Sequence, residues 1–307
     1  MKIITGTTDF ILQEETAVAI GKFDGVHLGH RLLIEEILAQ KAYGRKACIF
    51  TFDTMPARLF GNRDEKELTT KDEKRKLFEL MGVDILIEFP FNRETAGTLP
   101  EVFIREILCN KIRAKLIAAG TDISFGYKGV GDATLLSLLA PECGYEVRII
   151  EKLMAEGKEI SSTLIRDAIE KGDMQLAERL LGSPYTVRGE VLHGNHMGHS
   201  LGMPTMNLIP PADKLLPPNG VYYAGVLLNG IRYKGISNIG YKPTIEETEK
   251  VMGVETYLYG FDADAYGKEI EVFLYEFKRP EKKFESLEVL KTQVEKDIRD
   301  GEQYSRF

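Results

Sequence analysis

The stretch Gly21-Lys-Phe-Asp-Gly-Val-His-Leu-Gly-His30 decides the fold of the first half of the chain. It follows an apolar run at 16–20, which predicts a buried strand, and precedes residues 31–38, whose apolar side chains recur at helical spacing. A glycine-rich turn at a helix N-terminus presents backbone N–H groups and the positive helix dipole to anionic oxygens. We call residues 21–30 the opening turn and interpret it as a nucleotide site, in which His27 and His30 contact one polyphosphate.

The bulk composition is that of an ordinary globular protein. The 307 residues suffice for two domains, and 43% of them are apolar and 28% charged. The net charge of -7 argues against a nucleic-acid surface, and we expect neither a leader peptide nor a membrane partner. Three widely spaced cysteines, Cys48, Cys109 and Cys143, indicate buried thiols in a reducing compartment. We therefore expect a cytoplasmic protein.

The first half alternates between short apolar runs and amphipathic periods. Strands are predicted at 16–20, 46–52, 83–89, 115–119 and 146–151, and helices at 30–43, 71–81, 100–111, 132–142, 162–171 and 173–181. This order predicts an α/β domain with a doubly wound parallel sheet, covered by helices on both faces. Ligands of such sheets bind beyond the carboxyl ends of the strands. The opening turn, Asp53 and residues 120–122 should meet there.

The pattern changes after Leu181-Gly-Ser-Pro184. Short β-rich runs follow at 185–192, 221–228, 231–238, 254–261 and 269–278, and a helical period returns at 286–303. Asn229-Gly230 between two such runs predicts a tight hairpin. We expect a first domain at 1–183 and, at 184–307, a small antiparallel β-barrel with a C-terminal helix.

Several motifs resemble those of one enzyme superfamily. The H-x-G-H quartet of the opening turn and Ile160-Ser-Ser-Thr-Leu-Ile-Arg166 are similar to the two signatures of the nucleotidyltransferases. At the second motif Ser161 or Ser162 also has a purely structural explanation as a helix cap. Arg166, one helical turn further on, can donate to a phosphate. Gly120-Thr-Asp-Ile-Ser-Phe-Gly126 is similar to the family segment that faces ATP and flavin.

The second half resembles riboflavin kinase. The similar segments are Leu201-Gly-Met-Pro-Thr-Met-Asn207, Val254-Glu-Thr-Tyr257, Tyr266-Gly-Lys-Glu269 and Phe277-Lys-Arg-Pro-Glu281. Because both halves match in order, the chain is identified as a member of the bacterial bifunctional riboflavin kinase/FMN adenylyltransferase (FAD synthetase) family. The resemblance implies ATP, riboflavin, FMN and FAD as substrates and products, with Mg²⁺ accompanying ATP.

In the first domain the resemblance implies that FMN attacks the α-phosphorus of ATP and releases pyrophosphate, with His27 and His30 as catalytic residues. The remaining nucleotide-binding residues implied there are Gly21, Phe23, Asp24, Gly25, Asp122, Ser162 and Arg166. Asp122 contacts the nucleotide, an associated magnesium ion or the flavin. Phe125 either stacks on the flavin or is an ordinary core aromatic, and the sequence leaves both readings open.

In the second domain the resemblance implies transfer of the ATP γ-phosphoryl group to the 5′-hydroxyl of riboflavin. Glu255 is the implied catalytic base, because a neutral alcohol is a poor nucleophile. Thr205 and Asn207 are two apart, so both face one way in an extended chain and can present oxygens to Mg²⁺ and the nucleotide. Gly198, with Gly194 and Gly202, reads as a flexible phosphate flap.

The chain departs from the family pattern at several ligand positions. His199 and Lys242 replace arginines, Thr54 replaces a proline, and Ile123 replaces a common phenylalanine. These changes affect expected affinities and leave the fold prediction unaltered. His193, His196 and His199 also form an H-x-x-H-x-x-H run, which suits Zn²⁺ or Ni²⁺ only on an ordered scaffold.

Three alternatives remain at the level of sequence. In the first, one of the two activities is lost and its domain persists as a scaffold. The changes at His199 and Lys242 point to the kinase activity as the one affected. A flavin- and nucleotide-binding regulator without turnover would not need the complete set of catalytic side chains. A transferase acting on another substrate would not need a riboflavin kinase-like second domain.

Overall fold

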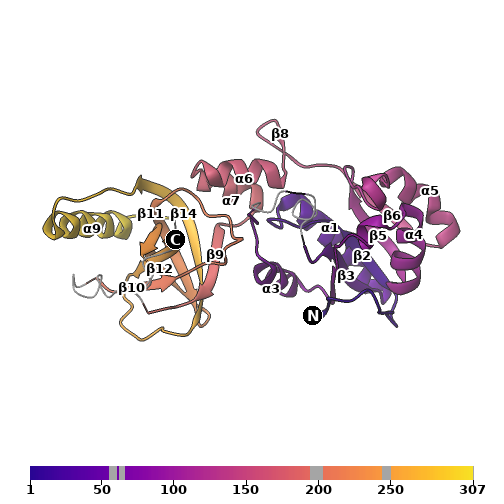
Figure 1. The fold of residues 1–307 in the computed structure, drawn as a ribbon, viewed down its shortest axis with the longest axis horizontal. Coiled ribbons are helices and arrows are strands. Elements are labelled where there is room, and N and C mark those ends of the chain that lie inside the picture. The colour runs from indigo at the N-terminus through magenta and orange to yellow at the C-terminus, as the bar shows by residue number, and fades with distance from the viewer. Residues whose placement is uncertain (55–60, 62–65, 194–202, 244–249, 307) are drawn as a thin grey trace. The chain divides into compact units, whose positions relative to one another are not determined.

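The computed structural model describes residues 1–54, 61, 66–193, 203–243 and 250–306. The chain divides into two units, Met1–Ser162 and Thr163–Phe307. In Figure 1 the first unit runs from indigo to magenta and the second from rose to yellow. Each unit has a sheet and a core of its own, so each is described by itself.

Six parallel strands form the sheet of the first unit, which confirms the predicted doubly wound α/β fold. They are β1 (Lys2–Thr5), β2 (Thr16–Ile20), β3 (Lys46–Phe52), β4 (Ile85–Phe89), β5 (Ala114–Gly120) and β6 (Glu146–Ile150). Their order is β1-β4-β3-β2-β5-β6. From β2 the chain continues into β3 and β4, which lie with β1 on one side of β2 in the sheet, whereas β5 and β6 lie on the other side of β2. The carboxyl end between β2 and β5 is therefore the switch point, where such sheets bind ligands.

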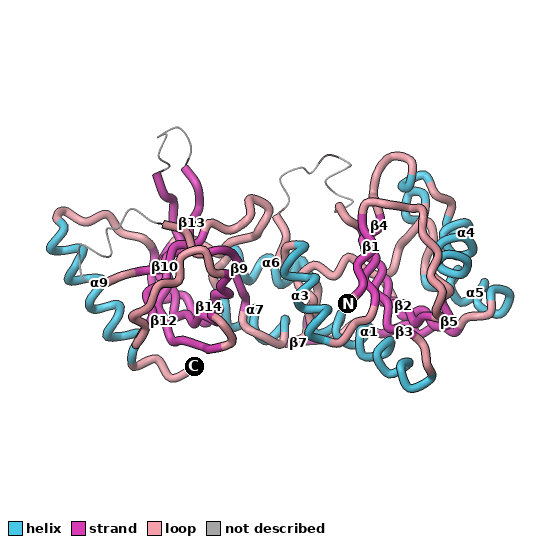
Figure 2. Tube along the Cα trace, turned by 90° about the horizontal axis from the view of Figure 1, so that it is seen from below, coloured by secondary structure: helices cyan, strands magenta, loops and turns pink. Residues whose placement is uncertain are grey.

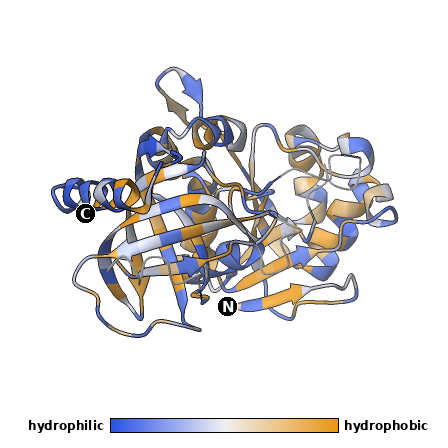
Figure 3. Ribbon diagram, turned by 60° about the vertical axis from the view of Figure 1, so that its left-hand side comes forward, coloured by the Kyte–Doolittle hydropathy of each residue, from blue (hydrophilic) through white to orange (hydrophobic). Residues whose placement is uncertain are grey.

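Alternate residues of the strands enter two separate cores. Val18 and Ile20 face one core, whereas Ala17 and Ala19 face the other. Helices α1 (Leu28–Ala39) and α3 (Lys71–Met81) contribute to the second core, and η3 (Phe103–Lys111) and α5 (Ala133–Cys143) to the first. The strands of this sheet appear largely orange in Figure 3, as expected for strands buried on both faces.

The remaining described elements of the first unit are short. They are η1 (Gln40–Tyr43), η2 (Thr95–Gly97), α4 (Pro100–Val102), η4 (Tyr127–Gly129) and the hairpin of β7 (Met154–Ala155) and β8 (Lys158–Glu159). The helix predicted at 100–111 continues from α4 as the π-helix η3, and the Ile112 N–H donates to the Ile107 carbonyl at 2.9 Å. The edge strand β1 was not predicted, because its four residues are mostly exposed and contain no long apolar run.

Six antiparallel strands form the sheet of the second unit, in the order β10-β13-β12-β11-β14-β9. They are β9 (Tyr185–Glu190), β10 (Thr205–Leu208), β11 (Gly220–Leu228), β12 (Ile231–Pro243), β13 (Lys250–Leu258) and β14 (Glu269–Pro280). The sheet curls, as the magenta strands of Figure 2 show, and the Leu192 N–H donates to the Asn207 carbonyl at 2.7 Å. This bond joins the chain just beyond β9 to β10, so the predicted small barrel is confirmed.

The hairpin between β11 and β12 confirms the turn predicted from sequence. Leu228 pairs with Ile231, which leaves a loop of two residues. Asn229 and Gly230 have φ values of 52° and 81°, the left-handed pair that a type I′ turn requires.

Among the residues that the structure describes, three helices belong to the second unit. They are α6 (Ser162–Glu170), whose first residue ends the first unit, α7 (Met174–Leu181) and α9 (Leu287–Glu302). Helix α7 contacts β14, where Gln175 Nε2 donates to Glu276 Oε2 at 2.7 Å. Helix α9 is fixed to the sheet by Asp297, which is 3% exposed and accepts from Arg279 Nε at 2.9 Å. The functional boundary at 183/184 remains a prediction.

Candidate functional site

The opening turn has an unusual backbone. Phe23, Gly25 and Val26 have φ values of 52°, 88° and 44°. A left-handed conformation is uncommon for side chains other than glycine and is a genuine outlier for a β-branched residue such as valine. Val26 is only 2% exposed, so packing holds it in place. Strain of this kind, between β2 and α1 at the switch point of the sheet, is typical of a functional site.

His27 and His30 lie against each other at the start of α1. Their rings stack with centroids 3.7 Å apart, and the His27 Nδ1 accepts the His30 N–H at 3.3 Å as the helix N-cap. A neutral His27 whose Nδ1 accepts must carry its proton on Nε2. Gly29 leaves room for this arrangement, since a Cβ there would lie 3.2 Å from the His27 Cε1.

Both histidines are neutral at pH 7. Burial lowers the pKa of His27 from 6.5 to about 4, against the opposing attraction of Asp122. Burial also lowers the pKa of His30 well below its ordinary value, and the neighbouring charges of His27 and Lys74 act in the same direction. The pair can therefore donate hydrogen bonds to phosphate oxygens, but it does not supply positive charge.

Hydrogen bonds from other segments of the chain hold the opening turn. Asp24 is 3% exposed, and its Oδ1 accepts from the backbone N–H groups of Leu68 at 2.8 Å and Thr69 at 3.3 Å. Ser162 donates its hydroxyl to the Asp24 carbonyl at 2.8 Å. The structure thus brings together the opening turn and the beginning of the second motif. The sequence placed Asp24 with the nucleotide. In the structure its carboxylate accepts hydrogen bonds from the segment before α3.

Other predicted residues take separate positions around this turn. Asp122 follows β5, pairs with Lys152 Nζ at 3.3 Å and lies near enough to affect His27. Phe125 is 5% exposed and packs against Phe103 with ring centroids 5.4 Å apart, so it is a core aromatic in this structure. Arg166 lies within α6, in the second of the two units. Its contact with phosphate therefore remains a prediction.

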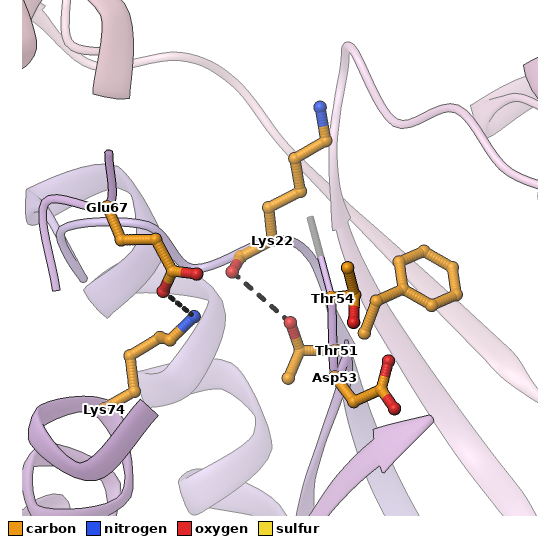
Figure 4. A pocket seen from close by; sticks show the side chains of 7 residues that line it. Lys22, Thr51, Asp53, Thr54, Glu67 and Lys74 are labelled. Carbon is orange, nitrogen blue, oxygen red and sulfur yellow. Dashed lines mark hydrogen bonds and ion pairs between the residues drawn. The ribbon is translucent and has the colours of Figure 1, made fainter. Parts of the chain in front are cut away.

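A small pocket lies beside the opening turn on its β3 side. Figure 4 shows its lining residues, which are Lys22, Thr51, Phe52, Asp53, Thr54, Glu67 and Lys74. The Thr51 hydroxyl donates to the Lys22 carbonyl at 3.3 Å, and Asp53 Oδ1 accepts the Phe91 N–H at 3.0 Å. Lys74 Nζ lies 3.4 Å from Glu67 Oε2. The sequence pointed to Asp53 and to the turn that contains Lys22 but missed Lys74, since charged residues in helix α3 read as an exposed surface.

In the second unit three strands place the predicted kinase residues in one row. Asn207 on β10 pairs directly with Glu255 on β13, which in turn pairs with Asn238 on β12. Residues directly opposite each other share a face of the sheet, and Thr205, two residues before Asn207, shares it as well. The sequence missed Asn238, because only strand register shows it to be a neighbour of Glu255.

The opposite face of these strands is the interior of the barrel. Leu208, Val254 and Ile239 are fully buried there, and the Ser237 and Thr256 hydroxyls lie 2.7 Å apart. The row of Asn207, Glu255 and Asn238 therefore faces the other way. Asn207 Nδ2 donates to the Thr205 carbonyl at 3.3 Å, which fixes the orientation of its amide. The donor set of hydroxyl, amide and carboxylate oxygens suits Mg²⁺.

The histidine run and the positions that depart from the family pattern lie partly outside the described residues. Gly198, with His196 and His199, lies outside the described residues. His193 stacks on Tyr266 with ring centroids 3.8 Å apart, and no group of three metal-ligating side chains occurs in the described part of the chain. Of the three other departures, Thr54 lines the pocket beside the opening turn, Ile123 packs against the core of the first unit, and the backbone of Lys242 pairs with Val251.

Two family models match the chain, one after the other. The model described as FAD synthetase matches residues 10–164, and that described as riboflavin kinase matches residues 181–305. Curated relatives named bifunctional riboflavin kinase/FMN adenylyltransferase cover nearly the whole chain. The Listeria monocytogenes relative is 37% identical and covers 96% of this chain and 94% of its own. The Escherichia coli relative is 34% identical and covers 97% and 96%.

A solved structure has the same overall fold. It is described as a macrolide-efflux protein from Streptococcus pneumoniae, is 28% identical, covers 99% of both chains and has a TM-score of 0.86. Among the described residues of the present chain, no helix has the length and apolarity needed to cross a membrane.

Proposed function

The chain belongs to the bifunctional riboflavin kinase/FMN adenylyltransferase family, and on this premise we propose which of its residues carry out each reaction. The enzyme phosphorylates riboflavin to FMN with ATP and adenylylates FMN to FAD. The observation that supports both assignments is the order of the two family matches, each of which spans one of the two candidate sites. We assign adenylyl transfer to residues 1–183 and the kinase to residues 184–307.

In adenylyl transfer an FMN phosphate oxygen attacks the α-phosphorus of ATP, and pyrophosphate leaves. Positioning and charge stabilisation account for most of the catalysis, since no enzyme nucleophile is required. We assign His27 the role of donating its Nε2–H to a phosphate oxygen, with His30 stacked beside it. The opening turn, from Gly21 through Phe23, Asp24 and Gly25, supplies the backbone around the triphosphate. Asp122, Ser162 and Arg166 complete the proposed nucleotide site.

In the kinase reaction the 5′-hydroxyl of riboflavin attacks the γ-phosphorus of ATP. Glu255 accepts the proton of that hydroxyl as the general base. The strand register, in which Asn207 pairs with Glu255 and Thr205 lies on the same face, supports a role for their oxygens beside the base. These two residues would hold Mg²⁺, which neutralises phosphate charge when it accompanies ATP. Gly198 belongs to the nucleotide site by the resemblance alone.

The flavin contacts and the location of the enzyme are further proposals. Asp122 is close to the opening turn and suits a polar contact with flavin or nucleotide. Phe125 would need its ring uncovered to stack on flavin, which makes it the weakest residue of the set. Free thiols at Cys48, Cys109 and Cys143 suit a reducing cytoplasm.

A single assay tests the proposed function. The protein is incubated with riboflavin, ATP and Mg²⁺, and riboflavin, FMN and FAD are separated by chromatography. FMN should appear first and FAD after it. FMN without FAD would refute adenylyl transfer, FAD formation only from supplied FMN would refute the kinase, and the absence of both products would refute turnover altogether.

A further inference from the structure

The pocket on the β3 side of the opening turn contains a cation that the mechanism above does not use. Lys74 is 8% exposed and Glu67 is 3% exposed, and their charged atoms lie 3.4 Å apart. Desolvating an ammonium and a carboxylate costs about as much as their attraction returns, so a buried pair is weak evidence for a stabilising role. Lys74 also lies in the first turns of α3, where the helix dipole disfavours a positive charge.

The position of Lys74 relates it to the catalytic turn. Its charge contributes to lowering the pKa of His30, and the pocket that it lines includes Lys22 of the opening turn. In Figure 4 the Glu67–Lys74 pair lies across the pocket from Thr51 and Thr54. Among the described residues, no hydrogen-bond partner reaches the buried Nδ1 of His30. A buried polar atom without a partner requires an explanation, and a catalytic role or a bound ion or water is among the usual ones.

The topology separates two places around the opening turn. The switch point between β2 and β5, where Asp122 lies, suits the donor nucleotide. The pocket lies on the other side, at the end of β3 and beside α3. The acceptor must approach from a direction that the donor does not occupy, and its reacting group is a phosphate dianion. Two lysines and two threonine hydroxyls have the chemistry to bind such a group.

We propose that this pocket binds the phosphate of FMN and that Lys74 is the cation that neutralises it. In the absence of FMN, Glu67 is the counter-ion of Lys74, and the incoming phosphate takes over that role. The inference rests on the proposed adenylyl transfer and adds a residue to its acceptor side. Because the phosphate exchanges with Glu67, removing that carboxylate should favour FMN.

The test compares Michaelis constants in the full-length enzyme. Lys74→Met combined with Glu67→Gln removes the ion pair without leaving an unpaired buried charge. The KM for FMN should rise by about tenfold to a hundredfold, the loss of one charge-assisted hydrogen bond, while the KM for ATP changes by less than about twofold. Glu67→Gln alone should lower the KM for FMN. Lys76→Met is the matched control, because Lys76 is exposed on the same helix and pairs with Glu79.

Each result decides between the proposal and a purely structural ion pair. An unchanged KM for FMN in the double variant would overturn the proposal, and so would a rise in the KM for ATP alone. An increase in the KM for FMN on Glu67→Gln would also overturn it. An unchanged KM for ATP in FAD formation reports that the first unit is folded, whereas FMN formation from riboflavin reports on the second unit only. If the unmodified enzyme makes no FAD from FMN, the proposed adenylyl transfer itself fails, and this outcome is separate from the others.

Discussion

The two candidate sites prepare for phosphate chemistry in opposite ways. The first uses an irregular turn, in which Phe23 and Val26 are held at positive φ beside a helix N-terminus. The second uses regular strands, whose register sets Asn207, Glu255 and Asn238 side by side. Much of the first site is therefore backbone, which a substitution does not remove, whereas the second depends on one side-chain carboxylate. Single substitutions should accordingly have larger effects in the second.

The largest effect is expected for Glu255→Gln. Loss of the general base should reduce FMN formation by about 10²–10⁴-fold, the usual contribution of general acid–base catalysis. FAD formation from supplied FMN should remain, as measured by chromatography of the flavins. Glu269→Gln serves as the control, since Glu269 forms an exposed ion pair with Arg188 on the same sheet. Loss of both activities in Glu255→Gln would contradict two separate sites.

The combined change of His27→Ala and His30→Ala tests the first site. FAD formation should fall by about 10²–10³-fold, as expected when hydrogen-bond donors to the transition state are removed. The backbone donors of the opening turn remain and limit the loss. FMN should accumulate when the variant is supplied with riboflavin and ATP. Undiminished FAD formation would show that the histidines do not contact the reacting phosphates.

Acid should weaken the first unit through His27. In the unfolded chain this histidine binds a proton below about pH 6.5, but in the folded chain its pKa is about 4. The unfolded state therefore binds more protons between these values, so the free energy of unfolding falls as the pH falls from 6.5 towards 4. At about 1.4 kcal/mol per pKa unit, the loss approaches about 3 kcal/mol.

His27→Gln should lack this component of the pH dependence. Denaturant unfolding of both proteins at pH 7 and pH 5, followed by a probe in the first unit, measures the difference. Equal losses of stability in the two proteins would rule out His27 as the titrating group.

The smallest effect concerns the two left-handed turns. Val26 is buried and its packing offsets the cost of a positive φ, whereas Asn229 has φ 52° in an exposed hairpin. Asn229→Val should therefore lower the free energy of unfolding by about 1–2 kcal/mol, because no burial compensates the steric cost. Asn229→Gly is the control and should be nearly neutral. A neutral Asn229→Val would imply that the strain at Val26 is also small.

Local sequence patterns predicted most of the fold. Buried strands such as β2 are continuous apolar runs, and Asn229-Gly230 identified its hairpin. The strands that escaped prediction are short or partly exposed, such as β1 at the edge of its sheet and the four residues of β10. Neither strand is long enough for its alternation of apolar and polar residues to be distinguished from that of the neighbouring loops.

The candidate sites were predictable where a motif is contiguous and less so elsewhere. His27 and His30 lie on one turn, and the structure confirms that they are adjacent. Asn238 and Glu255 are brought together by strand register, which the sequence does not state. Lys74 lies in a run of charged residues, yet it is buried and pairs with Glu67 in the folded chain. Long-range pairing of this kind depends on tertiary packing.

The hydrogen bond from Leu192 to Asn207 closes a seam between the end of β9 and β10. Asn207 therefore contributes in two ways. Its backbone carbonyl accepts the hydrogen bond that joins the end of β9 to β10, and its side chain faces the proposed metal and nucleotide. Local opening of the seam leaves β10 paired with β13 alone, as an edge strand of the sheet. A ligand held by Asn207 in the closed barrel stabilises the closed state relative to the open one. Part of its binding free energy is therefore used to keep the barrel closed.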